Sequence, residues 1–144
     1  MIRDIRKIVS KYRRKYQTSD PFEIAEALGI QIQVGNLGTR EGCYMYLKRH
    51  KCIFLNESLD EHERLFVMAH ELGHAILHPR ENCYYIRNKT GLLISKTEME
   101  ANKFAIELLL PDDVLIEYIN SGYTTEQVSR ITGYHRKMIE LRLN

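Results

Sequence analysis

The sequence lacks a long apolar run, a strong excess of charge and a dense set of cysteines. Its 144 residues include 21 Lys and Arg against 19 Asp and Glu, so the formal net charge is only +2. A chain so close to neutral does not have the general basic character of a nucleic-acid coat protein. No apolar stretch approaches the roughly 20 residues that span a bilayer, so no transmembrane helix is expected. The basic N-terminus is not followed by an apolar segment of about 7–15 residues, so it does not predict a secretory signal.

Cysteine is scarce, with Cys43, Cys52 and Cys83 as the three examples. An odd number of cysteines in a chain without a secretory signal indicates free thiols in a reducing cytoplasm. Their spacing does not match a cysteine-type zinc site, so thiol ligation of a metal is not expected. The sequence also has no internal repeat, low-complexity tract or linker. We therefore expect one globular, cytoplasmic domain over residues 1–144.

Charge is distributed unevenly along the chain. Residues 1–16 combine an apolar pattern of helical spacing with seven basic side chains and one acidic side chain. This segment carries +6, so the rest of the chain carries −4. A basic helix of this kind is most often a solvated face, although it could also dock an acidic partner. After it, Asp20, Pro21 and Glu23 predict a helix start with a capping box, and Gly29 predicts the end of that helix.

Three short segments predict strands. Residues 30–34 alternate apolar and polar side chains, which is typical of a half-buried strand. Residues 43–47 and 52–55 are apolar and aromatic and flank a basic turn, which favours a β-hairpin. Longer helical patterns follow at residues 59–78, ended by Pro79, and at 97–110.

The order of these elements predicts an α+β fold. Residues 79–95, between the two long helices, read as a polar loop or a short insert, and two or three short helices complete the chain. Helices followed by a small sheet and then by further helices indicate a mainly helical α+β domain with a small three-stranded β-sheet.

The most informative pattern is His-Glu-x-x-His at His70, Glu71 and His74. Residues four apart on a helix share a face, so His70 and His74 direct two imidazoles to one point, which suits tetrahedral zinc. Glu71 is then placed to act as general base on a metal-bound water without itself ligating. The flanking residues are small or apolar, which predicts a buried helix, where such polar groups are costly unless satisfied. The alternative is a core helix whose histidines are satisfied by hydrogen bonds alone.

A catalytic zinc ion usually takes three protein ligands. Spacing alone does not decide which residue is the third. His78 lies about 12 Å along the helix axis from His70, so one ion cannot bind both, and a role at the helix end fits it better. Glu98 and Glu100 are about 200° apart around the next helix, so only one of them faces the site. Either glutamate could instead close a capping box. We favour Glu98 because it shares a face with Asn102, which could hydrogen-bond a ligand histidine.

The pattern around these residues resembles the motifs of a known protein family. The segment Met68-Ala69-His70-Glu71-Leu72-Gly73-His74 is followed, at characteristic spacing, by Glu98, Ala101, Asn102, Phe104, Ala105, Leu108, Leu109 and Pro111. The two motifs together are similar to the ImmA/IrrE family of metallopeptidases. The strand ending at residues 53–56 and the closing segment 125–143 also match, so the resemblance covers about residues 20–143.

The resemblance implies a minimal zincin-like domain whose sheet packs on the zinc-binding helix. It implies one catalytic zinc ion held by His70, His74 and Glu98 in a gluzincin-like arrangement, with Glu71 as general base. We expect residues 20–111 to form the catalytic core and residues 112–144 to form helices packed on it.

The function implied is that of a site-specific endopeptidase from a bacterium, phage or mobile element. In this family such an antirepressor cleaves or inactivates a partner DNA-binding repressor, for which a helix-turn-helix protein is expected. A chain of 144 residues has no room for a fused repressor domain, so we expect the repressor to be a separate protein.

Two other functions compete with proteolysis. Residues 125–143 have the spacing of a helix-turn-helix, and Arg136, Lys137 and Arg142 could face DNA phosphates. A helical hairpin packed on the core is the favoured interpretation of this segment, so direct nucleic-acid binding is not expected. The other competitor is a non-hydrolytic regulator that contains zinc and inactivates its partner by contact alone.

Overall fold

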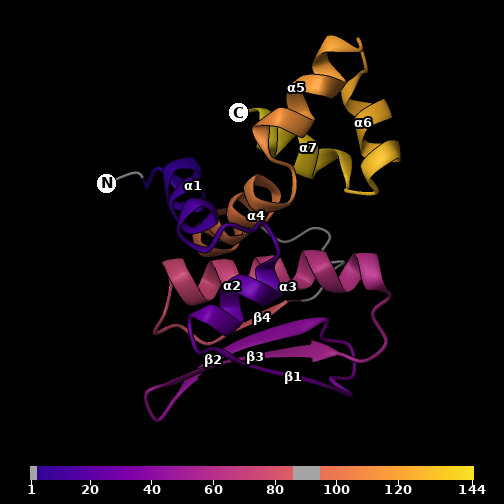
Figure 1. Ribbon diagram of the computed structural model, residues 1–144. Coiled ribbons are helices and arrows are strands. Elements are labelled where there is room, and N and C mark those ends of the chain that lie inside the picture. The colour runs from indigo at the N-terminus through magenta and orange to yellow at the C-terminus, as the bar shows by residue number, and fades with distance from the viewer. Residues whose placement is uncertain (1–2, 86–94) are drawn as a thin grey trace.

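In the computed structural model, helices cover one face of a small sheet (Figure 1). The structure describes residues 3–85 and 95–144. The elements are, in chain order, α1 (Ile5–Tyr16), α2 (Pro21–Ala27), β1 (Gln31–Gly35), β2 (Gly42–Leu47), β3 (His50–Asn56), α3 (Glu61–Leu77), β4 (Cys83–Tyr85), α4 (Lys96–Leu109), α5 (Asp112–Asn120), α6 (Thr125–Thr132) and α7 (Arg136–Leu143). Figure 1 shows α3 lying along the sheet, with α1 and α4 on the other side of α3 and α5–α7 beyond them. The predicted α+β class is confirmed. No helix in the described ranges is long and apolar enough to cross a membrane.

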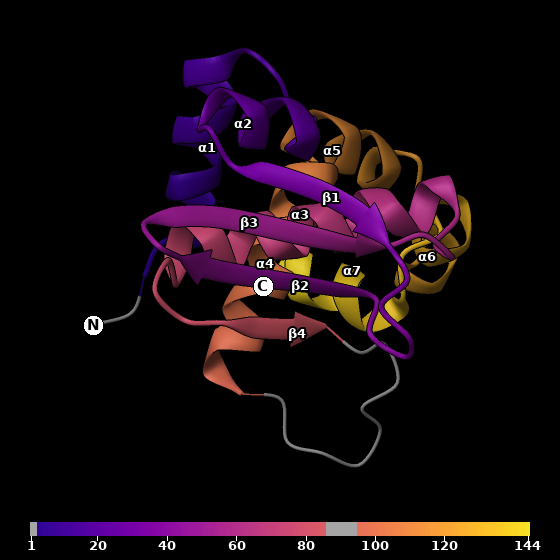
Figure 2. The ribbon, with the colours of Figure 1, turned by 90° about the horizontal axis from the view of Figure 1, so that it is seen from below.

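The sheet contains the three predicted strands and a short addition. Its order is β1-β3-β2-β4, with β1 parallel to β3 and with β2 antiparallel to both of its neighbours (Figure 2). The hairpin pairs Tyr44 with Ile53, and both side chains are fully buried. Strand β4 lies in the segment predicted to be a loop or insert. The sequence does not predict this strand, because three residues are too few to show an alternating pattern. Cys43 and Cys52 are free thiols, whereas the side chain of Cys83 lies outside the described part.

Helix α3 is the central element. Asp60 and Glu63 form a reciprocal capping box at its start, and His78 ends it directly before Pro79. Its residues 67–75 are buried because the sheet covers one side and α4 covers the other. The two helices approach closely at Gly73, where an added Cβ would lie 3.1 Å from the Phe104 Cβ. This close approach carries the side chains of α4 to those of α3.

The predicted helix starts are partly reproduced. Asp20 caps α2 through the Phe22 N–H, and Pro21 is the first residue of the helix. The expected capping box is wrong, however, because the Glu23 carboxylate accepts a hydrogen bond from the Thr18 hydroxyl. A threonine hydroxyl two residues before the cap competes successfully for that carboxylate.

The three C-terminal helices enclose a second apolar cluster. It consists of Ile106, Leu110, Leu115, Val128 and Ile139. Helix α7 also packs on α4. Helix α4 therefore joins the C-terminal helices to α3.

Candidate metal centre

Three side chains from α3 and α4 converge on one small space. The His70 Nε2 atom lies 2.8 Å from the Glu98 Oε2 atom, and the His74 Nε2 atom lies 3.1 Å from the same oxygen. The two histidine nitrogens are 3.2 Å apart. Both histidines are fully buried, whereas the Glu98 side chain is 20% exposed. We call the three atoms the ligand triangle.

The dimensions of the ligand triangle fit a zinc ion. Ligand atoms about 2.0–2.1 Å from zinc in a tetrahedron are about 3.3–3.4 Å from one another. The observed sides of 2.8, 3.1 and 3.2 Å are a few tenths of an ångström shorter. Two imidazoles and one carboxylate are also a usual donor set for zinc at a catalytic site, with the fourth position left for reactants.

The hydrogen bonding of His70 requires a proton or a metal cation between its ring and Glu98. Its Nδ1 atom lies 2.8 Å from the Asn102 Oδ1 atom, which can only accept, so Nδ1 carries the ring proton. The Nε2 atom of a neutral ring then has only a lone pair, and it faces a carboxylate oxygen at 2.8 Å. Two acceptors approach this closely only when a proton or a metal cation lies between them.

Electrostatics favour the ligand forms of these groups. Burial lowers the pKa of His74, and the hydrogen bond to Glu98 only partly opposes this. Burial raises the pKa of Glu98, but the hydrogen bonds from His70 and His74, together with the charge of these rings when they are protonated, outweigh it and hold that pKa well below 4.5. Neutral imidazoles and an ionised carboxylate are the states that bind metal.

Glu71 lies beside this centre in a different environment. It is fully buried, and neither carboxylate oxygen has a hydrogen-bond partner among residues 3–85 and 95–144. Strand β2 passes directly over it, since an added Cβ on Gly42 would lie 3.1 Å from the Glu71 Oε2 atom and 2.5 Å from Val67. Burial, with the nearby Glu98 charge, raises the pKa of Glu71 well above 4.5. A buried carboxylate without donors is poised to take up a proton.

The two glutamates that spacing left open point to different histidines. Glu98 lies at the ligand triangle, whereas the Glu100 Oε1 atom lies 2.9 Å from the Nε2 atom of His78. The Nδ1 atom of His78 lies 3.1 Å from the Nδ1 atom of His74, on the side of the ring away from the triangle. Helix α4 begins after Ser95, whose hydroxyl accepts from the Glu98 N–H, so the capping box proposed for Glu100 does not form.

The contact between His78 and Glu100 was not foreseen. The available signal was the four-residue step from His74 to His78, which places the two rings on one helix face. Distance along the axis excludes His78 from the triangle, but it does not exclude a contact with the outer nitrogen of His74.

The helix-turn-helix-like tail does not present the expected basic surface. Arg142 is buried, at 2% exposure, and donates to the Leu110 carbonyl and to the carboxylates of Glu107 and Asp112, so it does not face solvent as the DNA-binding alternative requires. Arg136 is exposed but forms an ion pair with Glu140. Arg136 and Arg142, two of the three side chains considered for phosphate contact, are therefore paired with carboxylates of the same chain.

Comparisons with known proteins identify the family of the chain. Residues 25–144 match the peptidase family described as IrrE N-terminal-like domain. The chain is 40% identical over 139 residues to Uncharacterized immunity region protein 2 of Bacillus phage phi105, covering 96% of this chain and 88% of that protein. It is 36% identical over 121 residues to Metallopeptidase ImmA of Bacillus subtilis (strain 168), covering 81% of this chain and 70% of that protein.

Proposed function

Because this chain belongs to the ImmA/IrrE family of metallopeptidases, we propose that it is a zinc-dependent endopeptidase that cleaves a partner DNA-binding repressor. The observation that carries the proposal is the ligand triangle of His70, His74 and Glu98 beside the buried carboxylate of Glu71. A purely structural metal site would have no use for a buried carboxylate without donors at its edge.

The chain's own residues divide the work of peptide hydrolysis. His70, His74 and Glu98 would hold the ion. When bound, zinc supplies Lewis acidity that polarises a carbonyl and acidifies water. Asn102 holds the His70 ring by accepting a hydrogen bond from its Nδ1–H group, so that Nε2 stays directed at the triangle.

Glu71 is the proposed general base. It takes a proton from the attacking water and returns it to the nitrogen of the departing amine, so the carboxylate is regenerated in each cycle. Burial and the neighbouring Glu98 charge raise the pKa of Glu71, which makes its carboxylate a stronger base. Burial of Glu71 keeps bulk water from competing for that proton.

The proposed substrate is a protein, a helix-turn-helix repressor on a separate chain. The names of the two relatives, an immunity region protein and a metallopeptidase, support a regulatory peptidase of a bacterium, phage or mobile element. The place of action is then the cytoplasm, where a DNA-bound repressor works.

The test begins with metal content and continues with cleavage. We expect the purified chain to contain one equivalent of zinc, His70→Ala to lose it and Glu71→Gln to retain it. Co-expression with the repressor encoded beside its gene should yield repressor fragments with the wild type and none with either variant. A folded native protein that binds no zinc contradicts the proposal. Loss of repression without fragments would replace cleavage with inactivation by contact.

A further inference from the structure

We propose that His78 and Glu100 are positioning residues for His74. Two hydrogen bonds in series, from His74 to His78 and from His78 to Glu100, determine which nitrogen of each ring carries a proton. The proposal rests on the proposed function, because it takes His74 to be a zinc ligand. We call these three side chains the His74 relay.

The geometry of the relay is continuous and protected. His78 is the residue that ends α3, and its side chain is 5% exposed. Its Nδ1 atom lies 3.1 Å from the Nδ1 atom of His74, and its Nε2 atom lies 2.9 Å from the Glu100 Oε1 atom. Helix α4 supplies Glu98 to the triangle and Glu100 to the relay, about half a turn apart, so the two carboxylates reach different nitrogen atoms.

The direction of each proton follows from the chemistry of the groups. A carboxylate only accepts, so the Nε2 atom of His78 must carry hydrogen and donate to Glu100. A neutral His78 then has a lone pair at Nδ1, which accepts a hydrogen bond from the Nδ1–H group of His74. With its proton on Nδ1, His74 presents a lone pair from Nε2 to the ligand triangle. The fixed charge of Glu100 thus selects the tautomer of His74 that binds metal.

The two ligand histidines are therefore oriented by independent partners. His70 donates to the amide oxygen of Asn102, 2.8 Å away, whereas His74 donates to a second histidine backed by a carboxylate. A change in His78 or Glu100 should weaken one ligand and leave the environment of His70 intact.

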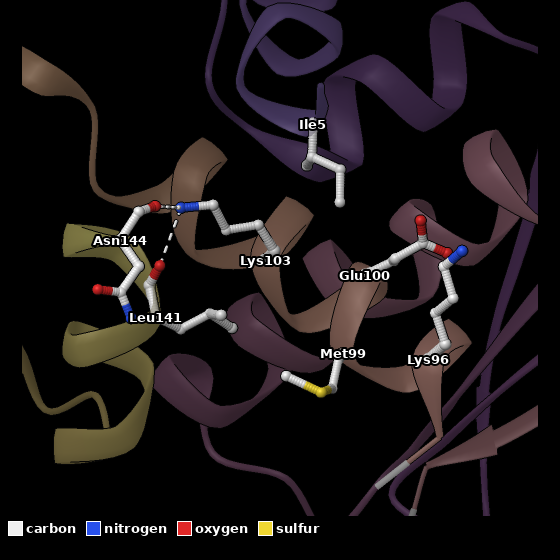
Figure 3. Close-up of a pocket in the computed structure, with 7 residues that line it drawn as sticks. All are labelled: Ile5, Lys96, Met99, Glu100, Lys103, Leu141 and Asn144. Carbon is white, nitrogen blue, oxygen red and sulfur yellow. Dashed lines mark hydrogen bonds between the residues drawn. The ribbon is translucent and has the colours of Figure 1, made fainter. Parts of the chain in front are cut away.

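Glu100 is accessible from outside, whereas the histidines are not. Figure 3 shows it in the wall of a pocket between α1, α4 and α7, with Lys96 one turn earlier on the same helix. Its side chain is 14% exposed, compared with 5% for His78 and none for His74. Substitution of Glu100 therefore removes the end of the relay without leaving a closed cavity in the core.

The first test measures zinc affinity by equilibrium competition with a chelator. We expect His78→Leu and Glu100→Leu to bind zinc about 10–100-fold more weakly than the wild type. His78→Asn should recover part of the loss, because its Oδ1 atom keeps an acceptor near the position of Nδ1. Glu100→Gln should lose less than Glu100→Leu, because the amide oxygen still accepts from His78.

The matched control is His62→Leu, the same change on the same helix. His62 contacts the Thr132 carbonyl oxygen at 2.7 Å and stacks near Tyr134, away from the triangle. Its loss should leave zinc affinity unchanged.

The second test reads the tautomers directly in the zinc-loaded wild type by ¹⁵N NMR of the imidazoles. We expect His78 to be protonated at Nε2, with scalar coupling across the His74 Nδ1–H to His78 Nδ1 hydrogen bond. His78 protonated at Nδ1 overturns the relay, and this measurement does not depend on any variant folding. Wild-type affinity in both leucine variants also overturns it while leaving the proposed function standing. A wild type that binds no zinc overturns both proposals.

Discussion

Glu71 and Glu107 are two buried glutamates on adjacent helices, and their surroundings are opposite. Glu107 of α4 is 3% exposed, and one of its oxygens lies 2.8 Å from the Lys103 ammonium and 3.4 Å from the Arg142 guanidinium. Glu71 of α3 is fully buried, and in the described part of the chain both of its oxygens lack a donor. The carboxylate of Glu107 therefore has cationic partners, whereas the carboxylate of Glu71 has no hydrogen-bond donor in the described part of the chain.

This difference indicates that the charge of Glu107 stabilises the fold, whereas the carboxylate of Glu71 is available for chemistry. The Glu107 cluster joins α4, α5 and α7, because Arg142 also contacts Asp112 and the Leu110 carbonyl. Every charge there has an opposite charge, which makes the burial tolerable. Glu71 has no such compensation, and a group kept in that state is available for proton transfer.

The largest effect is expected from Glu71→Gln. It should reduce cleavage by about 10²–10⁴-fold, because the amide cannot accept the proton, while zinc content stays the same. Stability should not fall, since the variant removes a carboxylate that has no donors among the described residues. Cleavage assays, elemental analysis and thermal melts measure the three quantities. Glu107→Gln is the mirror control, which should lose stability and retain zinc, and the reverse result would break the comparison.

Removal of Arg142 should be the most damaging change to stability. Arg142→Met leaves the carboxylate of Glu107 buried with fewer partners, which should cost about 3–5 kcal/mol of unfolding free energy. Urea denaturation measures the loss. Arg136→Met is the matched control, because the Arg136 side chain is 65% exposed and its ion pair is worth about 0.5 kcal/mol or less. Equal losses in the two variants would contradict a structural role for the buried pair.

Gly73→Ala should disturb the metal centre through packing rather than charge. The added methyl would lie 3.1 Å from the Phe104 Cβ and 3.2 Å from the Ala101 Cα, which should cost about 1–3 kcal/mol. It should also weaken zinc binding by moving Glu98 away from the two histidines. Denaturation and chelator competition measure these effects. Gly35→Ala, with nothing within 4 Å of the added carbon, should change neither.

The smallest effect concerns pH and Asp112. Its hydrogen bond and ion pair with Arg142 lower the pKa of this carboxyl below 3.8, although burial opposes the shift. A lowered pKa stabilises the folded state above the unfolded-state pKa, and this contribution is lost as pH falls through the lowered value. Asp112→Asn should therefore cost up to about 1 kcal/mol at pH 7, because the side chain is 69% exposed. Denaturation of the metal-free proteins should show the difference shrinking as pH falls below about 3.8 and vanishing only once pH lies below the lowered pKa of Asp112. A difference that does not shrink with falling pH would exclude the ion pair as its source.

Much of the fold follows from local patterns that can be seen in the sequence. The capping residue Asp20, the stop at Pro79 and the hairpin around residues 48–49 depend on interactions a few residues apart, and all of them form. Strand β4 and the burial of Arg142 could not be foreseen in this way. Arg142 is buried by contacts with residues 30 to 35 positions earlier in the chain, so its exposure depends on how α7 packs.

In the candidate site, too, some features follow from local sequence and others from the packing of helices. The spacing of His70 and His74 places both rings on one face of a helix, which is a property of helical geometry that no packing can alter. The third side chain is different. Glu98 and Glu100 lie about half a turn apart on α4, and only the face that Glu98 shares with Asn102 favours it in the sequence. Contact between α3 and α4 at Gly73 and Ala101 sets the rotation of α4, so that Glu98 meets the two histidines and Glu100 meets His78. Only the packed pair of helices makes that choice, because it depends on where two surfaces touch.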